Sequence, residues 1–344
     1  MRLDDLDYPL PEELIAQHPA ARREDARLLV VERATGALHD RHITDLAQWL
    51  RPGDALALNE TRVREARLEV ARAATGGRIE LLFVRPEPAR EPGAWRVLAR
   101  PAKRVRAGER LVAPGIEFEV MEALAEGERI VRVTAGDLDR TLREQGALAL
   151  PPYIRRAIEP GDRERYQTVY ARVEGAIAAP TAGLHFTDRL LAELAAAGIG
   201  SARIVLHVGP GTFRPISAPD PASHRMDEEY FEVPGDAAAM LAATRARGGR
   251  IVAVGTTVVR ALESACDANG GRLAAAQGWT RKFILPPYTF RGVDALLTNF
   301  HLPRTTLLLL VAAFAGGENL KRAYAHAVEE RYRFYSYGDA MLIV

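Results

Sequence analysis

Three histidines in loops of small residues are the side chains best suited to chemistry in this sequence. His185 lies in the stretch AAPTAGLHF, residues 178–186, where Ala, Gly and Pro otherwise dominate. His207 ends an apolar run and precedes the turn GPGTF, and His301 lies in LTNFHLP. A histidine exchanges protons near neutral pH without a large pKa shift, and glycines beside it let backbone approach a ligand. We therefore predict that these loops line one pocket, in which a histidine acts as a general acid or base.

Each of these loops also fits a purely structural interpretation. Residues 178–186 and the turn 209–213 would equally serve as tight turns, and His301 beside Asn299 would equally be a hydrogen-bonded core histidine. The prediction of a shared pocket rests on the position of His207 and His301 after apparent strands. In open α/β sheets, ligands bind outside the carboxyl ends of the strands.

A strand followed by a helix gives a further candidate site. IVAVGTTVVRALES, residues 251–264, predicts a buried strand that ends at Gly255 and a helix that starts at Thr256 or Thr257. Free N–H groups and threonine hydroxyls at a helix start suit a phosphate or an amino-acid carboxylate. The stretch lacks the second and third glycines of a dinucleotide fingerprint, and a capped core helix is the alternative.

Arginine is concentrated in one part of the chain. Residues 51–110 hold 14 Lys and Arg against 8 Asp and Glu. Arginine suits bidentate phosphate contact, although arginine-rich solvated faces would give the same composition. The segment PPYIRR, residues 151–156, is a second basic strip, for a phosphate backbone or in a solvated linker. The predicted nucleic-acid-binding residues are Arg100, Lys103, Arg104, Arg155 and Arg156.

Aromatic and basic residues also alternate near the end of the chain. ERYRFYSYGDAM, residues 330–341, interleaves two arginines with Tyr and Phe. This pattern suits stacking on flipped-out bases, and an aromatic strand packed on the core would look the same. Asp339, beside Gly338, is a candidate carboxylate.

Composition excludes several classes of protein. The chain has 344 residues, 48% hydrophobic and 26% charged, with a net charge of +1, which is typical of a soluble globular protein. The single cysteine, Cys266, excludes a disulfide framework and a cysteine-based zinc or iron–sulfur site. The acidic start is no signal peptide, and the longest apolar run, Leu307 to Ala315, is too short to span a bilayer. We expect a cytoplasmic monomer that binds no membrane.

Motifs for metal ions and covalent nucleophiles are missing. HExxH and paired CxxC are absent, and the His39 and His42 of HDRH have no third ligand nearby, so a hairpin face explains them better. GxSxG is absent too, and Cys266 falls in a predicted helix. We expect no metal and no permanently bound cofactor.

Two different sequence patterns divide the chain into two domains. Short β-like runs between Gly and Pro turns fill residues 61–150 and predict a small antiparallel β domain, for which a barrel is one architecture. Residues 151–344 alternate buried strands, including 202–209 and 250–255, with helices such as 188–199. That alternation predicts an α/β domain. Residues 281–288 are interpreted as a further strand, and residues 1–60 as part of the α/β domain.

Motifs along the whole chain match one known family. They are LDYPLPEELIAQHP, NETRV, LPPYIRR, ERYQTVYA, AAPTAGLHFT, LHVGPGTFRP, VGTTVVRALES, LTNFHLP and YRFYSYGDAMLI. With these motifs in this order, the chain resembles the S-adenosylmethionine:tRNA ribosyltransferase-isomerases of queuosine biosynthesis. The resemblance implies a large α/β domain with an inserted β-barrel-like domain, in agreement with the two sequence patterns described above.

The resemblance also implies a reaction. The ribosyl part of S-adenosylmethionine would be transferred to 7-aminomethyl-7-deazaguanine at the wobble position of tRNA, leaving epoxyqueuosine and releasing adenine and methionine. S-adenosylmethionine would be a co-substrate, and tRNA carrying the deazaguanine precursor the partner. The sulfonium acidifies the C5′ protons, so the reaction needs a general base, and adenine departure needs a proton donor.

Positions in the matching motifs assign candidate residues. The implied catalytic residues, without a division of acid and base roles, are His185, His207, His301, Glu229 and Asp339. The implied substrate-binding residues are Thr181, Gly183, Gly209, Gly211, Thr212, Thr256, Thr257, Arg260, Asn299 and Tyr337.

The sequence departs from the family pattern at four positions. Asp227 stands where a second histidine is usual, so that histidine's role is not assigned to it. Glu60 replaces the usual Asp of NETRV, Ala261 the usual Thr, and Pro210 the common Ala of the GPGTF turn. None of these changes removes an obvious catalytic group.

Other functions make different demands on the sequence. An RNA-binding module needs the basic and aromatic strips but no histidine loops at strand ends. A methyltransferase normally shows a Gly-rich first loop and an acidic residue at the end of the next strand, which this chain does not show convincingly. Radical chemistry on S-adenosylmethionine needs three clustered cysteines, and only Cys266 is present.

Overall fold

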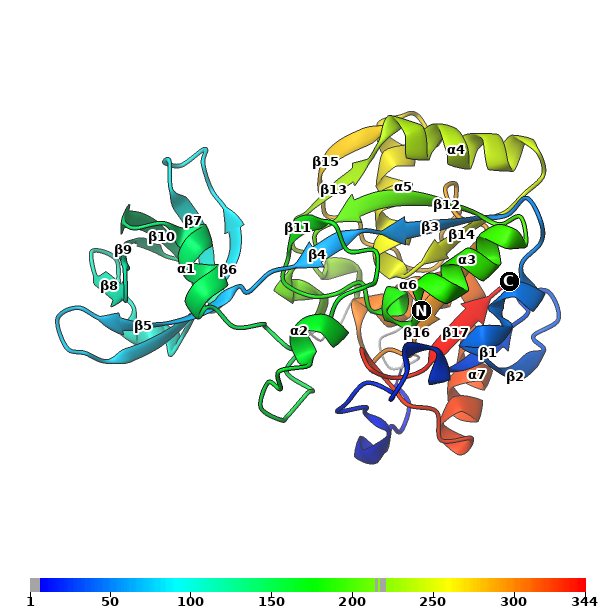
Figure 1. The fold of residues 1–344 in the computed structure, drawn as a ribbon, viewed down its shortest axis with the longest axis horizontal. Coiled ribbons are helices and arrows are strands. Elements are labelled where there is room, and N and C mark those ends of the chain that lie inside the picture. Colours follow the sequence, from blue (N-terminus) through cyan, green and yellow to red (C-terminus); the bar gives the residue numbers. More distant parts are fainter. Residues whose placement is uncertain (1–6, 214–215, 217–220) are drawn as a thin grey trace. The chain divides into compact units, whose positions relative to one another are not determined.

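The chain folds into two compact units. A computed structural model describes residues 7–213, 216 and 221–344, with side chains described at all of these except 212, 213 and 222. The larger unit comprises Met1–Arg62 and Pro151–Val344, and the smaller comprises Val63–Leu150. The smaller unit is thus an insertion into the chain of the larger one (Figure 1).

A mixed sheet forms the centre of the larger unit. Among the described residues, nine strands lie in the order β15 (Ala276–Thr280), β13 (Glu229–Val233), β12 (Gly200–Leu206), β3 (Ala55–Asn59), β14 (Ile251–Val254), β16 (Ala295–Asn299), β17 (Ala340–Ile343), β1 (Arg27–Val31) and β2 (Leu38–His42). The four central strands, β12, β3, β14 and β16, are parallel. β17 runs antiparallel to β16, which places the end of the described chain inside the sheet. β4 (Thr61–Val63) and β11 (Val173–Ala176) pair in a separate two-stranded sheet.

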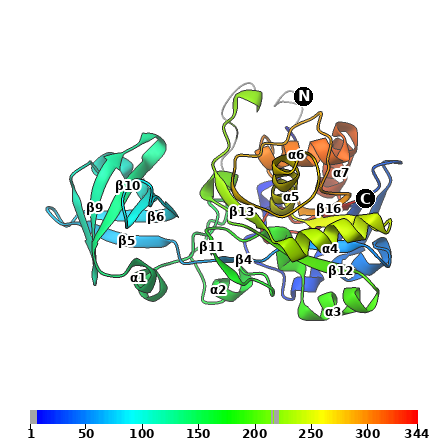
Figure 2. The same cartoon turned by 90° about the horizontal axis from the view of Figure 1, so that it is seen from above.

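Helices cover both faces of this sheet. The described helices and 3₁₀ turns of the larger unit are η2 (Glu12–Leu14), η3 (Arg23–Asp25), η4 (Ile43–Trp49), α2 (Asp162–Arg165), η7 (Thr181–His185), α3 (Asp188–Ala196), η8 (Pro210–Phe213), η9 (Pro221–Ser223), α4 (Gly235–Ala246), α5 (Thr256–Ala268), α6 (Thr306–Ala315) and α7 (Gly317–Glu329). Side chains of α4, α5, α6 and α7 join one apolar core, and those of η4 and α3 join the other. Figure 2 shows α4 and α3 on opposite sides of β12.

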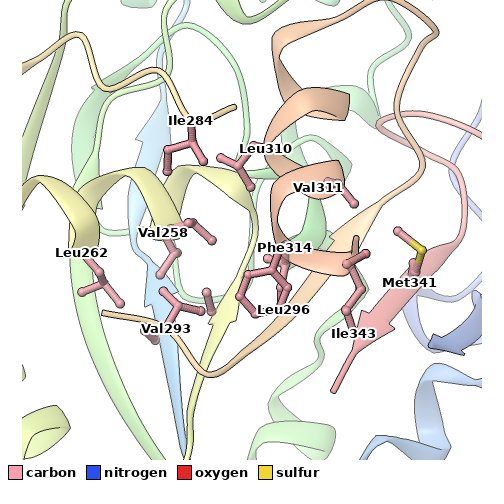
Figure 3. Close-up of a cluster of buried hydrophobic side chains, with 14 of the residues drawn as sticks. Val258, Leu262, Ile284, Val293, Leu296, Leu310, Val311, Phe314, Met341 and Ile343 are labelled. Carbon is pink, nitrogen blue, oxygen red and sulfur yellow. The ribbon is translucent and has the colours of Figure 1, made fainter. Parts of the chain in front are cut away.

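Strand β3 shows why the two faces need two cores. Successive side chains of a strand point to opposite faces. Ala55 and Ala57 accordingly pack into the first core, while Leu56 and Leu58 pack into the second. A strand buried on both faces reads as a continuous apolar run, as ALAL does here. Figure 3 shows the first core, where Val258 of α5, Leu296 of β16 and Phe314 of α6 gather with their apolar neighbours.

The smaller unit is a closed antiparallel barrel. Its strands follow the order β10 (Glu128–Ala135), β7 (Ala94–Arg100), β6 (Arg78–Pro86), β5 (Arg67–Arg72), β8 (Arg110–Ala113) and β9 (Ile116–Ala123). The turns η5 (Ala102–Arg104) and η6 (Ala125–Gly127) and the helix α1 (Leu138–Gln145) complete it. Alternate residues of β6, Ile79, Leu81 and Phe83, fill the interior, as period-2 patterning requires. The predicted fold class, an α/β domain with an inserted β barrel, is confirmed.

One detail of the predicted elements is wrong. Residues 281–288 form no strand, and the edge strand β15 (Ala276–Thr280) precedes them instead. Its sequence, AQGWT, has a half-exposed Trp279 and a glycine, so hydrophobic content does not mark it. Residues 43–49 form the 3₁₀ helix η4.

The described part of the chain has no helix long and apolar enough to cross a membrane. The most apolar helix, α6, has only 10 residues.

Candidate functional site

A pocket lies at the carboxyl ends of strands β14 and β16. Gly255 and the first two residues of α5 form one side, Thr298, Asn299 and His301 another, and residues 179–182 a third. Tyr153, Tyr335 and Ser336 close it from loops that are distant in sequence. This is the place where open α/β sheets hold ligands.

The start of helix α5 presents backbone donors to the pocket. Gly255 has φ 99° and precedes Thr256, and no side chain caps the helix. The first N–H groups of a helix have no acceptor within the helix, and Thr256 and Thr257 both line the pocket. Polar groups of a ligand can therefore bind here without competition from a capping side chain.

Asn299 connects the pocket to His185. Its Nδ2 donates to the carbonyl of Tyr335 at 2.9 Å and lies 3.3 Å from Nε2 of His185. His185 is 4% exposed, and burial, followed by the charges of Arg23 and Arg333, lowers its pKa to about 4. The ring is therefore neutral at pH 7, so that Nε2 accepts from the amide.

His301 is held on both its backbone and its ring. The hydroxyl of Tyr8 donates to its carbonyl at 2.5 Å, and its N–H donates to the hydroxyl of Tyr324 at 2.9 Å. Nε2 lies 2.9 Å from Oγ1 of Thr298. Burial lowers the pKa of His301 to about 3, so this ring is also neutral at pH 7. Neither histidine can donate as an imidazolium at that pH.

His207 lies at the end of β12 and is not among the residues that line this pocket. Its Nδ1 is 2.8 Å from Oγ1 of Thr61, and its ring stacks on Tyr230 with centroids 5.7 Å apart. A Cβ at Gly175 would collide with the imidazole, so a glycine is needed there. The next residue, Val208, does line the pocket.

Glu229 and Arg260 form a buried ion pair one turn along α5 from Thr256. Glu229 is 4% exposed and Arg260 is 3% exposed. Glu229 also accepts from the N–H of Gly209 at 2.8 Å, and Nε of Arg260 donates to the carbonyl of Lys282 at 2.9 Å. The pair thus fixes the GPGTF turn against α5. Nη2 of Arg260 is buried with no hydrogen-bond partner in the described part of the protein.

Comparison with known proteins identifies the family. A model of the queuosine biosynthesis protein family matches residues 3–343. The chain belongs to this family. The S-adenosylmethionine:tRNA ribosyltransferase-isomerase of Syntrophomonas wolfei is 52% identical over 348 residues, covering 100% of this chain and 97% of that protein. The protein of the same name from Symbiobacterium thermophilum is 50% identical, with 100% of both chains covered.

A solved structure of the family agrees with the fold. The crystal structure of the S-adenosylmethionine tRNA ribosyltransferase from Thermotoga maritima shares 38% identity with this chain and has a TM-score of 0.57. The match covers 99% of this chain and 100% of the Thermotoga maritima chain. The resemblance drawn from the sequence motifs is therefore confirmed, and the chain is an enzyme of the queuosine biosynthesis family.

Several motif residues of this family protein lie in structural positions. The two oxygens of the buried Asp339 accept the N–H groups of Arg27 at 3.0 Å and Arg333 at 2.7 Å. Burial raises the pKa of this carboxyl. Asp339 is not among the residues that line the pocket with Asn299. Its two backbone contacts hold the chain at Arg27 and Arg333, and its catalytic role stays a prediction.

Tyr337 and His185 line a smaller pocket next to the first, and Ser336 lines both. The Tyr337 hydroxyl donates to Asp162 at 2.9 Å. Asp162 also pairs with both terminal nitrogens of Arg156 at 2.7 Å. The guanidinium of Arg156 is therefore already paired with a carboxylate within the protein, and its phosphate contact stays a prediction.

Two glycines predicted as substrate contacts, Gly183 and Gly211, pack closely against other side chains. Gly183 lies against the hydroxyl of Tyr170 and Gly211 against the carboxylate of Asp227, so a side chain at either glycine would collide. Close packing accounts for both glycines. The side chain of Thr212 lies outside the described residues. Of the stretch that raised the question of a pocket, Ala179, Pro180, Thr181 and Ala182 line it.

Sequence reasoning missed Tyr153, Tyr335 and Thr298 as pocket residues. The rings of Tyr153 and Tyr335 pack with centroids 4.2 Å apart. Tyr153 lies in the motif LPPYIRR and Tyr335 in YRFYSYGDAM. The spacing of residues in these motifs does not show which aromatic ring points into the pocket. Thr298 lies in a strand and was interpreted as part of an apolar run.

The cations of the barrel unit divide into two groups. Arg72, Arg90, Arg96, Arg110 and Arg132 each pair with a glutamate. The side chains of Arg100, Lys103 and Arg104 are exposed, and none of them forms an ion pair with a carboxylate of the described residues. The buried guanidinium of Arg129 donates to the carbonyls of Val105 at 2.7 Å and Ala102 at 2.5 Å. It thereby fixes the backbone that carries the unpaired cations.

The described residues hold no group of three or more His, Cys, Asp and Glu side chains that could bind a metal ion. His39, considered in the sequence, lies 2.9 Å from Glu32 and packs on Trp49.

Proposed function

We propose that this protein transfers and isomerises the ribosyl part of S-adenosylmethionine onto 7-aminomethyl-7-deazaguanine at the wobble position of tRNA. The products are epoxyqueuosine-tRNA, adenine and methionine. The observation that carries the proposal is the convergence of six separate family motifs, around residues 153, 181, 208, 256, 299 and 335, on one pocket. The names of the full-length relatives support the same reaction class.

The pocket residues suit S-adenosylmethionine as a co-substrate. The start of α5 and Asn299 offer hydrogen bonds, and Tyr153, Tyr335 and Leu302 offer apolar and aromatic surface. Small-molecule sites combine such surface with a few fixed polar groups.

The reaction requires a base that removes a C5′ proton before adenine leaves with the electron pair of its glycosidic bond. The substrate amine then bonds to the ribosyl carbon, and an alkoxide closes the epoxide as methionine departs. A histidine with a pKa of about 3 or 4 is a weak base. We therefore assign hydrogen-bonding roles to His185 and His301, and retain His207 and Glu229 as the candidate bases.

The tRNA contacts belong in this proposal to the unpaired cations of the barrel. Arg100, Lys103 and Arg104 lie on one short segment whose backbone Arg129 holds. Phosphate contacts need cations that are not already neutralised by carboxylates. Arg155 is exposed and pairs only with the exposed Glu12 at 3.1 Å, so it remains a further candidate.

Product analysis tests the proposed function. The protein is incubated with S-adenosylmethionine and tRNA that carries the deazaguanine precursor, and the small molecules are separated. We expect equal amounts of adenine and methionine, with modified tRNA. S-adenosylhomocysteine would instead identify a methyltransferase, and the absence of any product would indicate a binding protein.

A further inference from the structure

The amide of Asn299 has a fixed orientation. Its Nδ2 faces two acceptors, the carbonyl of Tyr335 at 2.9 Å and Nε2 of His185 at 3.3 Å. A flipped amide would place its oxygen against the Tyr335 carbonyl, which has no hydrogen to donate. Oδ1 is therefore the atom of Asn299 that remains available to a ligand.

This oxygen has no partner within the described protein. Asn299 is 2% exposed and lines the pocket, and Oδ1 accepts no hydrogen bond from a described residue. The hydroxyl of Tyr335, which is 7% exposed and lines the same pocket, is also without a partner. Buried polar atoms are nearly always hydrogen-bonded. Two of them in one pocket indicate a ligand with at least one hydrogen-bond donor.

The charge of the pocket restricts the class of that donor. The described residues that line it include no Asp, Glu, Lys or Arg. A buried ammonium group would have no carboxylate partner there, and unpaired buried charges are costly. A purine-type base is neutral and flat, and its exocyclic amine is a donor. The paired rings of Tyr153 and Tyr335 and the small residues Ala179 and Ala182 suit such a base.

We propose that this pocket binds the adenine of S-adenosylmethionine, and that Oδ1 of Asn299 accepts a hydrogen bond from its exocyclic amine. The inference rests on the proposed function, because that function supplies the co-substrate. It also assigns the two ends of S-adenosylmethionine to different places. The base lies between α5 and Asn299, and the charged methionine end lies outside this pocket, whose described lining residues carry no charge. The deazaguanine of tRNA also carries an exocyclic amine and is the competing source of the same chemistry.

The proposal predicts selectivity against a 6-oxo base. Inosine presents an acceptor where adenosine presents the amine, so two acceptors would face each other at Oδ1. A site built to hydrogen-bond one group rejects an analogue that lacks it, because buried polar atoms remain unpaired. We expect the full-length protein to bind inosine about 10- to 100-fold more weakly than adenosine.

Competitive binding measurements test this with adenosine, inosine, 2′- and 3′-deoxyadenosine, free 7-aminomethyl-7-deazaguanine and methionine. In Asn299→Ala, the preference for adenosine over inosine should fall to within about threefold. The matched control is Asn269→Ala, which also removes an amide bonded to a backbone carbonyl, at 2.9 Å, but which does not line the pocket. That control should keep the wild-type preference.

The wild-type measurements alone can overturn the proposal, even if Asn299→Ala fails to fold. Equal binding of adenosine and inosine would refute it. Weaker binding of 2′- or 3′-deoxyadenosine than of adenosine would also refute it if the difference disappears in Asn299→Ala, since a ribose hydroxyl would then meet Oδ1. Binding of free 7-aminomethyl-7-deazaguanine or of methionine that weakens in Asn299→Ala would refute it as well, since a donor of that ligand would then meet Oδ1. If adenine and methionine are still released from S-adenosylmethionine and tRNA, only this inference fails. If no product forms, the proposed function fails.

Discussion

Glu229 and Arg260 are almost fully buried, and each is the partner that compensates the charge of the other. Removal of one partner from a buried ion pair leaves an uncompensated charge, whereas replacement of both by apolar groups is often tolerated. The carboxylate of Glu229 also holds the N–H of Gly209. At the scale of single residues, the Glu229 carboxylate therefore stabilises the fold and is also a candidate base.

Glu229→Gln should destabilise the protein by about 3 kcal/mol, because the Arg260 guanidinium stays buried without a carboxylate. Urea unfolding measures this loss. The double variant Glu229→Gln with Arg260→Met should recover most of the stability but not the release of adenine. Glu232→Gln, on the same strand and half-buried, is the matched control and should change stability by less than about 1 kcal/mol. Equal losses for Glu229→Gln and Glu232→Gln would contradict the importance of the pair.

The two neutral histidines predict how stability depends on pH. Their folded-state pKa values, about 4 for His185 and about 3 for His301, lie below the unfolded value of 6.5. The unfolded chain therefore binds protons first as the pH falls below about 6.5, and stability decreases from there toward the folded-state pKa values. Each histidine should contribute a loss of about 2 kcal/mol between pH 7 and pH 5.

Urea unfolding of wild type and His301→Gln at both pH values isolates one of these contributions. Glutamine does not titrate, so the loss between pH 7 and pH 5 should be about 2 kcal/mol smaller in the variant. An identical loss in the two proteins would show that His301 is not buried in its neutral form. Comparing losses removes the effect of Glu, Asp and the other histidines, which titrate in both proteins.

At the scale of elements, short caps and turns place the histidine loops. The hydroxyl of Thr187 accepts the N–H of Leu190 at 3.1 Å and starts α3 immediately after Phe186. Leu190 and Leu194 of that helix pack into the second core. The helix thereby fixes the end of the 3₁₀ turn that carries His185.

Thr187→Ala should cost about 1 kcal/mol of stability through the lost N-cap. Chemical denaturation provides the measurement, and Thr187→Ser should restore most of the loss because serine caps as well as threonine does. Unchanged stability in Thr187→Ala would show that solvent replaces the cap at no cost.

Element prediction succeeded where burial dictates the pattern. The strand at 251–254 and the helix at 256–268 follow from a continuous apolar run, a glycine and a long amphipathic stretch. It failed at the sheet edge, where β15 has alternating exposure and carries Gln277, Gly278 and Trp279. Residues 276–280 become a strand because they pair with β13. The sequence of this segment alone does not show that pairing.

At the scale of the whole molecule, the small unit accounts for the uneven charge of the sequence. Many of its arginines pair with glutamates, such as Arg110 of β8 with Glu117 of β9, and Arg90 with Glu122. No such pair is found among the described residues for Arg100, Lys103 and Arg104. The local arginine excess therefore has two causes, ion pairs across the barrel surface and one unpaired segment.

Replacing Arg100, Lys103 and Arg104 by Ala should weaken tRNA binding at least tenfold at low salt. The slope of log affinity against log salt should also become shallower by up to about 2 units, because fewer counterions are released. The control replaces the exposed but paired Arg90, Arg110 and Arg140, which removes the same charge from the same unit. Equal effects of the two triple variants would mean that only net charge matters and would contradict a defined tRNA surface.

The sequence by itself determined the family, the α/β class, the inserted barrel and the strand-end position of the key loops. Those features are encoded locally, in motif order, in alternation of burial and in glycine and proline turns. Only the tertiary structure decided which polar atoms share a pocket. It separated His207 and Asp339 from the residues that line the pocket with Asn299, and it brought Tyr153 and Tyr335 together. It also assigned Arg156 to Asp162. Such partnerships join residues far apart in the chain, and a side chain's partner depends on how the strands and loops pack rather than on its neighbours in sequence.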